Sequence, residues 1–243
     1  MTLIHLPETS STNSWLREHA CELPTDTLTV VRADHQTAGR GCGTNKWESE
    51  PGKNLLFSVL CHPEGVPAAQ QFILSMANAL ALRDTIDSYA GSAKIKWPND
   101  IYWHDFKICG TLIETTLSGH NVKDCIIGTG INVNQERFLS DAPNPVSLRQ
   151  ITGRDADCSE VLQTAMDNME RYLEMVRTGN WETIRAQYRC HLYRLRQTSP
   201  YRFADGRVEE CMLVNVTDDG HMELLNARRE LYRVAFKEVQ FIV

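Results

Sequence analysis

The stretch KIKWPNDIYWHDFKICGTLIETTLSGHNVKDCIIGTGINV, residues 94–133, decides the fold of this chain. Strand-forming residues fill four runs of it, and polar turn residues such as His104-Asp105 and Ser118-Gly119-His120 separate them. The predicted strands are Lys94–Trp97, Asp100–Trp103, Lys107–Thr116 and Asn121–Val133. Because no gap between them is long enough for a helix, the stretch predicts a strand meander rather than alternating βαβ units.

Towards the N-terminus the sequence predicts two further strands, Thr27–Val31 and Asn54–Cys61, with a polar, glycine-rich loop at 34–53 between them. Four residues able to cap a helix, Ser10–Asn13, precede a short apolar run at helical spacing. Apolar residues with a period of about 3.6 predict three more helices. These run from Pro67 to Gly91, from the capping pair Asp157-x-x-Glu160 to Gly179, and from Trp181 to Leu195.

The character of the chain changes near residues 197–200, beyond which only short strand-like runs occur. Two of them, Met212–Thr217 and Met222–Leu225, flank the hairpin turn Asp218-Asp219-Gly220, and a last run covers Val234–Val243. Such a segment predicts a small β-barrel. We therefore expect an α+β fold in which a mixed β-sheet flanked by helices, residues 1–196, carries a small C-terminal β-domain, residues 197–243.

Composition and charge exclude several classes of protein. With 25 Lys and Arg against 31 Asp and Glu, the net charge is −6, which argues against a broad basic surface for DNA. The apolar runs are of strand length, and the first residues lack the basic and apolar regions of a signal peptide. The eight cysteines are scattered without a Cys-x-x-Cys pair, which predicts reduced thiols and no zinc site. We expect a cytoplasmic protein that binds neither DNA nor membranes.

Three segments contain more Gly, Asn, Arg, Lys and Trp than packing requires. The first, QTAGRGCGTNKWES at 36–49, has glycines that let backbone N–H groups approach an anion, and Arg40 adds a charge able to bind it through two hydrogen bonds. The segment matches neither a dinucleotide fingerprint nor a P-loop. A flexible surface loop is the plain alternative.

The second segment, Lys96-Trp97-Pro98-Asn99-Asp100 followed by Lys107, places a cation at the end of a strand beside a carboxylate. The alternative is a strand whose lysines extend to solvent, ending in an Asn-Asp turn. The third segment, Gly128-Thr129-Gly130-Ile131-Asn132, has paired glycines in an apolar strand. Such glycines indicate either a ligand or backbone close to the strand, or a simple bulge.

In their order and spacing these segments resemble the biotin–protein ligase family over residues 5–135. The specific part is Lys-Trp-Pro-Asn-Asp followed seven residues later by Lys107. The matching pieces are Ser11-Thr12-Asn13, Gln36, Gly39-Arg40-Gly41, Trp47-Glu48-Ser49, Lys96–Asp100, Lys107-x-x-Gly110 with Glu114, and Gly128-x-Gly130-Ile131-Asn132. The resemblance implies a class II synthetase-like catalytic domain and an SH3-like C-terminal barrel.

The resemblance also implies a biotin–[acetyl-CoA-carboxylase] ligase that works in two steps. The carboxylate of biotin attacks the α-phosphate of ATP, which gives biotinyl-5′-AMP and pyrophosphate, and a lysine of a biotin carboxyl carrier domain then displaces AMP. Such chemistry needs cations and backbone donors directed at the phosphate. Mg²⁺ is expected on the triphosphate rather than at a metal site of the protein. We expect a monomer or a homodimer.

Carried over position by position, the resemblance assigns three sets of residues. Biotin would be held by Ser11, Thr12, Asn13, Gln36, Gly39, Arg40, Gly41, Cys42, Lys96, Gly110 and Gly128. ATP would contact Arg40, Trp47, Lys107 and Asn132. The catalytic groups would be Lys96 at the carboxylate, Arg40 in a closing loop, Lys107 at the phosphates, and Asp100, which would orient the acceptor lysine or take its proton.

Other interpretations stay open. A lipoate–protein ligase or octanoyltransferase shares the fold, although the Trp-Pro-Asn-Asp motif favours biotin. A non-enzymatic biotin or nucleotide sensor would require the loss of Lys96 or Lys107, and both are present. Some family members begin with a winged-helix DNA-binding domain, but only ten residues precede Ser11, so we expect ligation without transcriptional repression. The arginines at 185, 189, 194 and 196 are expected on a solvated face rather than against nucleic acid.

Many family members carry an arginine after Gly-Arg-Gly, where this chain has Cys42. We predict that Cys42→Arg slows the release of biotinyl-5′-AMP, because a guanidinium adds a charge-assisted contact to the phosphate. Lys46 is the other residue that would supply this charge. The measurement is the rate at which labelled biotinyl-AMP leaves the protein, and unchanged release kinetics would count against the prediction.

Overall fold

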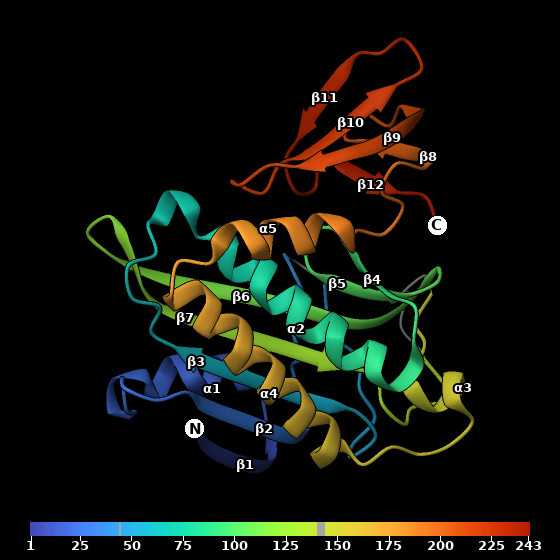
Figure 1. Ribbon diagram of the computed structural model, residues 1–243. Helices are drawn as coiled ribbons and strands as arrows, with labels where there is room; N and C mark the ends of the chain where they lie inside the picture. Colours follow the sequence, from blue (N-terminus) through green and yellow to red (C-terminus); the bar gives the residue numbers. More distant parts are fainter. Residues whose placement is uncertain (44, 140–143) are drawn as a thin grey trace.

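The computed structural model describes residues 1–43, 45–139 and 144–243, which form two β-sheets and the helices around them (Figure 1). The larger sheet has seven strands in the order β1-β2-β3-β7-β6-β5-β4. β1 and β2 are parallel, and the other neighbours are antiparallel, so the sheet is mixed, as expected. Its strands are β1 (Thr2–Thr9), β2 (Thr29–Gln36), β3 (Leu55–Cys61), β4 (Ala93–Lys96), β5 (Asp100–Trp103), β6 (Phe106–Ser118) and β7 (Asn121–Ile131).

The predicted meander is confirmed, because β4 to β7 pair in chain order before β7 returns to β3. The N-terminal end differs from the prediction in two ways. β1 was not predicted, since this edge strand is largely exposed and shows little apolar alternation; its pairing with β2 defines it. The polar loop begins after Gln36 rather than at Asp34, because β2 continues as far as its pairing with Thr9.

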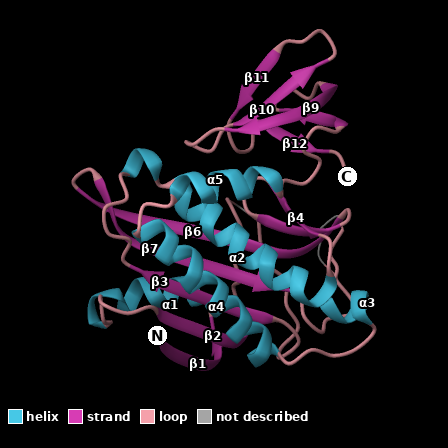
Figure 2. Cartoon of the chain, in the orientation of Figure 1, coloured by secondary structure: helices cyan, strands magenta, loops and turns pink. Residues whose placement is uncertain are grey.

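Helices cover the two faces of this sheet unequally (Figure 2). α2 is apolar on nearly all sides because α4 and α5 pack against it. α1 packs on the opposite face, in a smaller cluster. The helices are α1 (Thr12–His19), α2 (Phe72–Ala90), α3 (Leu148–Thr152), α4 (Cys158–Arg177) and α5 (Trp181–Cys190), with short 3-10 turns at Ala20–Glu22 and Ala68–Gln70.

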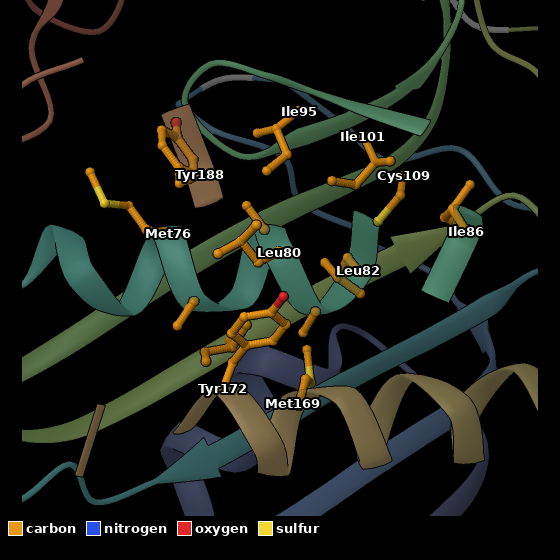
Figure 3. Packing of buried hydrophobic residues seen from close by; sticks show 14 of the residues in the cluster. Met76, Leu80, Leu82, Ile86, Ile95, Ile101, Cys109, Met169, Tyr172 and Tyr188 are labelled. Carbon is orange, nitrogen blue, oxygen red and sulfur yellow. The ribbon is translucent and has the colours of Figure 1, made fainter. Parts of the chain in front are cut away.

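Because successive side chains of a strand point to opposite faces of the sheet, neighbouring residues belong to different hydrophobic clusters. Val30 belongs to the large core beneath α2, whereas Val31 belongs to the cluster beneath α1. Figure 3 shows side chains of α2 between those of β4 and β5 on one side, such as Ile95, and those of α4 on the other, such as Met169. The face that carries α1 is left partly uncovered, and it is there that the candidate site lies.

The last predicted helix ends earlier than expected. α5 stops at Cys190, and the predicted positions Leu192 and Leu195 lie beyond it. The backbone leaves the helix because it pairs elsewhere: Ile95 donates to the His191 carbonyl at 2.9 Å, and Tyr193 donates back to Ile95 at 2.8 Å. The chain beyond the helix is thereby tied to β4.

The C-terminal unit is a five-stranded antiparallel sheet in the order β11-β10-β9-β8-β12. The predicted hairpin turn at Asp218-Asp219-Gly220 joins β9 to β10, as expected. The run Val234–Val243 is not one strand, because the turn Ala235–Glu238 divides it. The strands are β8 (Thr198–Phe203), β9 (Val208–Val216), β10 (Met222–Asn226), β11 (Leu231–Val234) and β12 (Val239–Phe241).

Arginines of α5 hold the two units together. Arg185 is 9% exposed, and its guanidinium lies 3.2 Å from the carboxylate of Asp218 in the β9–β10 turn. Arg189 reaches the same carboxylate at 2.6 Å and donates to the Val216 carbonyl at 3.0 Å. The expectation of a solvated face was therefore wrong for this pair, because the C-terminal unit covers that side of the helix.

Two global expectations can be compared with the structure. Within the described ranges, no helix is both long enough and apolar enough to cross a bilayer. All eight cysteines are free thiols, and five of them are buried.

We predict that Asp218→Ala lowers the free energy of unfolding by about 1–3 kcal/mol, because it removes the carboxylate shared by Arg189 and the buried Arg185, which keeps only its exposed ion-pair partner Glu182 among the described residues. Urea unfolding measures the change. The matched control is Glu210→Ala, an exposed carboxylate of β9 outside this contact, for which we expect about 0.5 kcal/mol or less. Equal effects of the two variants would show that the arginine pair does not anchor the unit.

Candidate functional site

A cavity of about 660 Å³ lies on the face of the large sheet that carries α1, where the C-terminal unit meets it. Residues of α1 and of the loop after β2 form one end, and the β4–β5 turn with Lys107 forms the other. β6 and β7 supply the floor. Phe236, Lys237 and the three residues of β12 close it from the C-terminal unit.

Three glycines lie in the floor of the cavity. Gly110 on β6 lies opposite Gly130 on β7, and Gly128 lies two residues along on the same face. A Cβ at position 130 would lie 2.3 Å from the indole of Trp47, and one at position 128 would lie 2.1 Å from the Asn13 carboxamide oxygen. The glycines therefore make room first for two side chains of the chain itself.

Hydrogen bonds fix the polar end of the cavity. The Ser58 hydroxyl donates to the Asn13 carboxamide oxygen at 2.6 Å and lies 2.6 Å from the Thr12 hydroxyl. The Gln36 oxygen accepts from the Thr12 backbone N–H at 2.8 Å and from its hydroxyl at 3.1 Å. Ser11 lies beside them and lines the cavity. Four predicted residues are thus brought together, and Ser58 is a partner that sequence analysis missed.

Glu114 is the second group that was not assigned a role, although it stands among the motif pieces. Its carboxylate accepts from Asn13 at 2.8 Å, Arg17 at 2.7 Å and Arg40 at 2.9 Å. Burial alone would raise the pKa of Glu114, but the Asn13 hydrogen bond and the charges of both arginines hold it below its usual value. The carboxylate therefore stays ionised. Through Arg40 it holds the glycine-rich loop after β2 (residues 37–43 and 45–49, called the glycine loop below) against β6.

The glycine loop forms a tight hairpin over this floor. The Trp47 N–H donates to the Gly39 carbonyl at 3.0 Å, and the Gly41 N–H donates to the Asn45 carbonyl at 2.8 Å. The indole N–H of Trp47 is buried without a hydrogen-bond partner among the described residues. It is a donor that a ligand or a movement of the loop would satisfy.

Cations gather at the other end. The Lys107 ammonium pairs with the Asp100 carboxylate at 2.7 Å. The Lys96 ammonium lies 4.9 Å from the centre of the Tyr102 ring and 5.2 Å from that of Phe241. Among the described residues the charged groups that line the cavity are Arg40, Lys46, Lys96, Lys107 and Lys237, against Asp100 alone. This excess of positive charge suits a ligand with several negative charges.

Burial lowers the pKa of Lys96 below the usual value for lysine, and the charges of Lys107 and Arg194 lower it further. The carboxylate of Asp100 acts in the opposite direction, since its negative charge stabilises the ammonium. A bound anion would raise the pKa of Lys96 in the same way. The site thus holds a cation whose charge is costly until an anion arrives.

Two predicted residues do not line the cavity. Asn132 is buried, and its carboxamide donates to the Val146 carbonyl at 3.1 Å, so the structure uses it to hold the chain after β7. Gly39 lies buried beneath the Trp47 carbonyl. Every other predicted site residue lines the cavity: Ser11, Thr12, Asn13, Gln36, Arg40, Gly41, Cys42, Trp47, Lys96, Asp100, Lys107, Gly110 and Gly128.

Comparison with known proteins agrees with this arrangement. Residues 6–132 match the Biotin/lipoate A/B protein ligase family. The bifunctional ligase/repressor BirA of Bacillus spizizenii is 37% identical over 141 residues, which are 56% of this chain and 42% of that protein. The biotin–[acetyl-CoA-carboxylase] ligase of Paracoccus denitrificans is 31% identical and covers 78% of this chain and 80% of its own length. The chain spans less than half the length of the first curated relatives it matches.

A similar solved structure is that of the biotin protein ligase of Aquifex aeolicus in complex with biotin and ATP. It covers 99% of both chains with a TM-score of 0.81 and 26% sequence identity. The large sheet with its helices and the small C-terminal sheet are therefore an arrangement shared with that protein, which confirms the expected fold class.

We predict that Asp100→Asn lowers the pKa of Lys96 further, because the substitution removes a negative charge that stabilises the ammonium. At a pH between the two values, less of Lys96 is then protonated in the variant. The measurement is an NMR pH titration of lysine labelled at Cε, with Lys96 assigned by its loss in Lys96→Ala. Asp167→Asn, on the exposed side of α4, is the control and leaves the titration unchanged. A Lys96 titration that Asp100→Asn does not move would refute the coupling.

Proposed function

The chain belongs to the biotin/lipoate A/B protein ligase family, and on that basis we propose that it joins biotin to a lysine of a carrier domain at the expense of ATP. The observation that carries the proposal is that one cavity contains both neutral hydrogen-bonding side chains and positively charged side chains. One end offers fixed amide and hydroxyl groups from Thr12, Asn13 and Gln36, and the other offers Lys96 and Lys107. The names of the relatives favour biotin.

In the proposed binding mode, the ureido ring of biotin lies at the polar end, where it exchanges hydrogen bonds with the side chains around Ser58. Its carboxylate then points along the glycine floor towards Lys96. The ammonium of Lys96 has no carboxylate bonded to it among the described residues, and a bound anion would offset the burial that lowers its pKa. This placement orients the nucleophile before the chemistry begins.

In the first step, a carboxylate oxygen of biotin forms a bond to the α-phosphorus of ATP, and the bond to the pyrophosphate oxygen breaks. The two anions repel each other, so the contribution of the protein is charge neutralisation and positioning. Lys96 neutralises the carboxylate, while Lys107 and the glycine-loop N–H groups hold the phosphates. Arg40 joins them after leaving Glu114, to which it is bonded here. The product is biotinyl-5′-AMP.

In the second step, the neutral amine of the acceptor lysine attacks the acyl carbon, and AMP leaves with the electrons of the broken C–O bond. The amine must lose a proton as the amide forms. Asp100 is the carboxylate that lines the cavity beside Lys107, and we assign it to orienting the amine or accepting that proton. The acceptor in this proposal is the biotin carboxyl carrier domain of a carboxylase.

Mg²⁺ enters the proposal only as a companion of the triphosphate, since this ion binds substrate phosphates with few protein ligands. The described residues contain no group of three His, Cys, Asp or Glu side chains able to hold a metal ion. The cytoplasm is the proposed location, supported by the eight free thiols.

The direct test incubates the protein with biotin, ATP, Mg²⁺ and a purified carrier domain, followed by mass spectrometry. We expect the mass of one biotin to be added at a single lysine. A parallel reaction with lipoate and its carrier domain separates the two branches of the family. Transfer of lipoate without transfer of biotin would replace this proposal by that of a lipoate ligase.

We predict that Lys96→Ala abolishes biotin-dependent exchange of pyrophosphate into ATP, with a loss of about 100-fold or more, because it removes the cation at the reacting carboxylate. Lys94→Ala is the matched control, since Lys94 lies two residues away on the same strand and is exposed. We expect its exchange rate to stay within about twofold of that of the unchanged chain. Equal rates in both variants would remove Lys96 from the mechanism.

A further inference from the structure

The turn between β11 and β12 brings a cation of the C-terminal unit to the cavity. Its residues Phe236 and Lys237 line the cavity, although they lie nearly two hundred residues from the glycine loop in sequence. The sequence motifs do not include this turn. Its side chains therefore need an explanation of their own.

The turn is built to hold Lys237 in place. The Glu238 carboxylate accepts the Ala235 N–H at 2.7 Å, and the Glu238 carbonyl accepts the Ala204 N–H at 2.9 Å. The Phe236 ring packs edge-on against Trp97, with centroids 5.9 Å apart. Between these anchors Lys237 adopts a φ of +73°, a left-handed conformation that L-residues with a side chain rarely adopt.

This conformation directs the Lys237 side chain at the glycine loop. A Cβ built on Gly43 would lie 2.2 Å from the Lys237 ammonium nitrogen, so the contact exists only because residue 43 has no side chain. Gly43 itself has a φ of +71°. The two left-handed residues meet where the loop and the C-terminal unit touch.

The charge of Lys237 is uncompensated. Lys107 is paired with Asp100, and Arg40 is paired with Glu114, whereas Lys237 forms no ion pair with any described residue. An ammonium beside the N–H groups of a glycine loop is a binding arrangement for phosphate. Cys42, next to Gly43, adds no positive charge of its own.

We propose that Lys237 binds the phosphates of ATP and then the phosphate of the adenylate, and so joins the C-terminal unit to the glycine loop around the nucleotide. This inference rests on the proposed function and extends it by one residue of the site. The C-terminal unit then supplies a ligand to the substrate, in addition to packing against α5. Lys237 also supplies the positive charge that position 42 lacks.

The test compares Lys237→Gln with Lys237→Arg. We expect Lys237→Gln to raise KM for ATP about tenfold in the pyrophosphate-exchange assay, with KM for biotin within twofold of that of the unchanged chain. Release of biotinyl-AMP should become faster by a similar factor. Lys237→Arg should restore both values to within about threefold, because the charge is retained. Arg228→Gln, on the exposed β10–β11 turn, is the control and should change neither.

The affinity for ATP is also measured by calorimetry without biotin. This measurement tests the role of Lys237 whichever acyl substrate the protein uses. A tenfold weaker affinity in Lys237→Gln supports the role of Lys237 even if lipoate proves to be the substrate. Unchanged affinity and unchanged KM in Lys237→Gln would overturn the inference while biotin transfer stands. Equal losses for ATP and biotin, unrestored by arginine, would show that the residue only supports the turn.

Discussion

The side chains of Asn13 and Trp47 rest directly on the main chain of β7, and this contact is what the rest of the site depends on. Gly128 and Gly130 leave the space, and a single methyl group at either position would collide with the side chain above it. Because successive strand residues alternate between faces, the opposite face of β7 still packs into the large core through Ile127. One strand therefore serves as core on one face and as the floor of the cavity on the other.

The two ends of the cavity are balanced differently. At the polar end, donors and acceptors satisfy one another from Gln36 through Ser58 to Glu114, and the Glu114 carboxylate offsets part of the charge of Arg17 and Arg40. At the other end positive charges outnumber the single carboxylate of Asp100. These cations repel one another, which costs free energy, and a bound polyanionic ligand would reduce that repulsion. The preorganised end suits recognition, and the charged end suits the reaction.

The C-terminal unit belongs to this arrangement through α5. Tyr188, fully buried on that helix, donates to the Pro98 carbonyl at 2.7 Å, and the Trp97 indole N–H donates to the Gly220 carbonyl at 3.0 Å. The segment between Lys96 and Asp100 is thus held from the helix and from the β9–β10 turn together. The same helix anchors that turn through its arginines. The position of the β4–β5 turn, which lines the cavity, and the position of the small β-sheet are therefore coupled.

The sequence by itself determined the meander, the long helices and the α+β class, because alternation, helical period and turn residues are local signals. All but two of the predicted site residues line the cavity. It did not predict β1, whose definition comes from pairing with β2. The pairing of β3 and β6 with β7 places Ser58 and Glu114 beside the site. Asn132 lies outside the site because its carboxamide donates to the Val146 carbonyl.

Lys237 reaches the glycine loop only because α5 and the two turns set one unit against the other. Such contacts join residues far apart in the chain, and no local pattern specifies the distance between them. Only the tertiary structure therefore decided which cations share one cavity and which side of α5 the C-terminal unit covers.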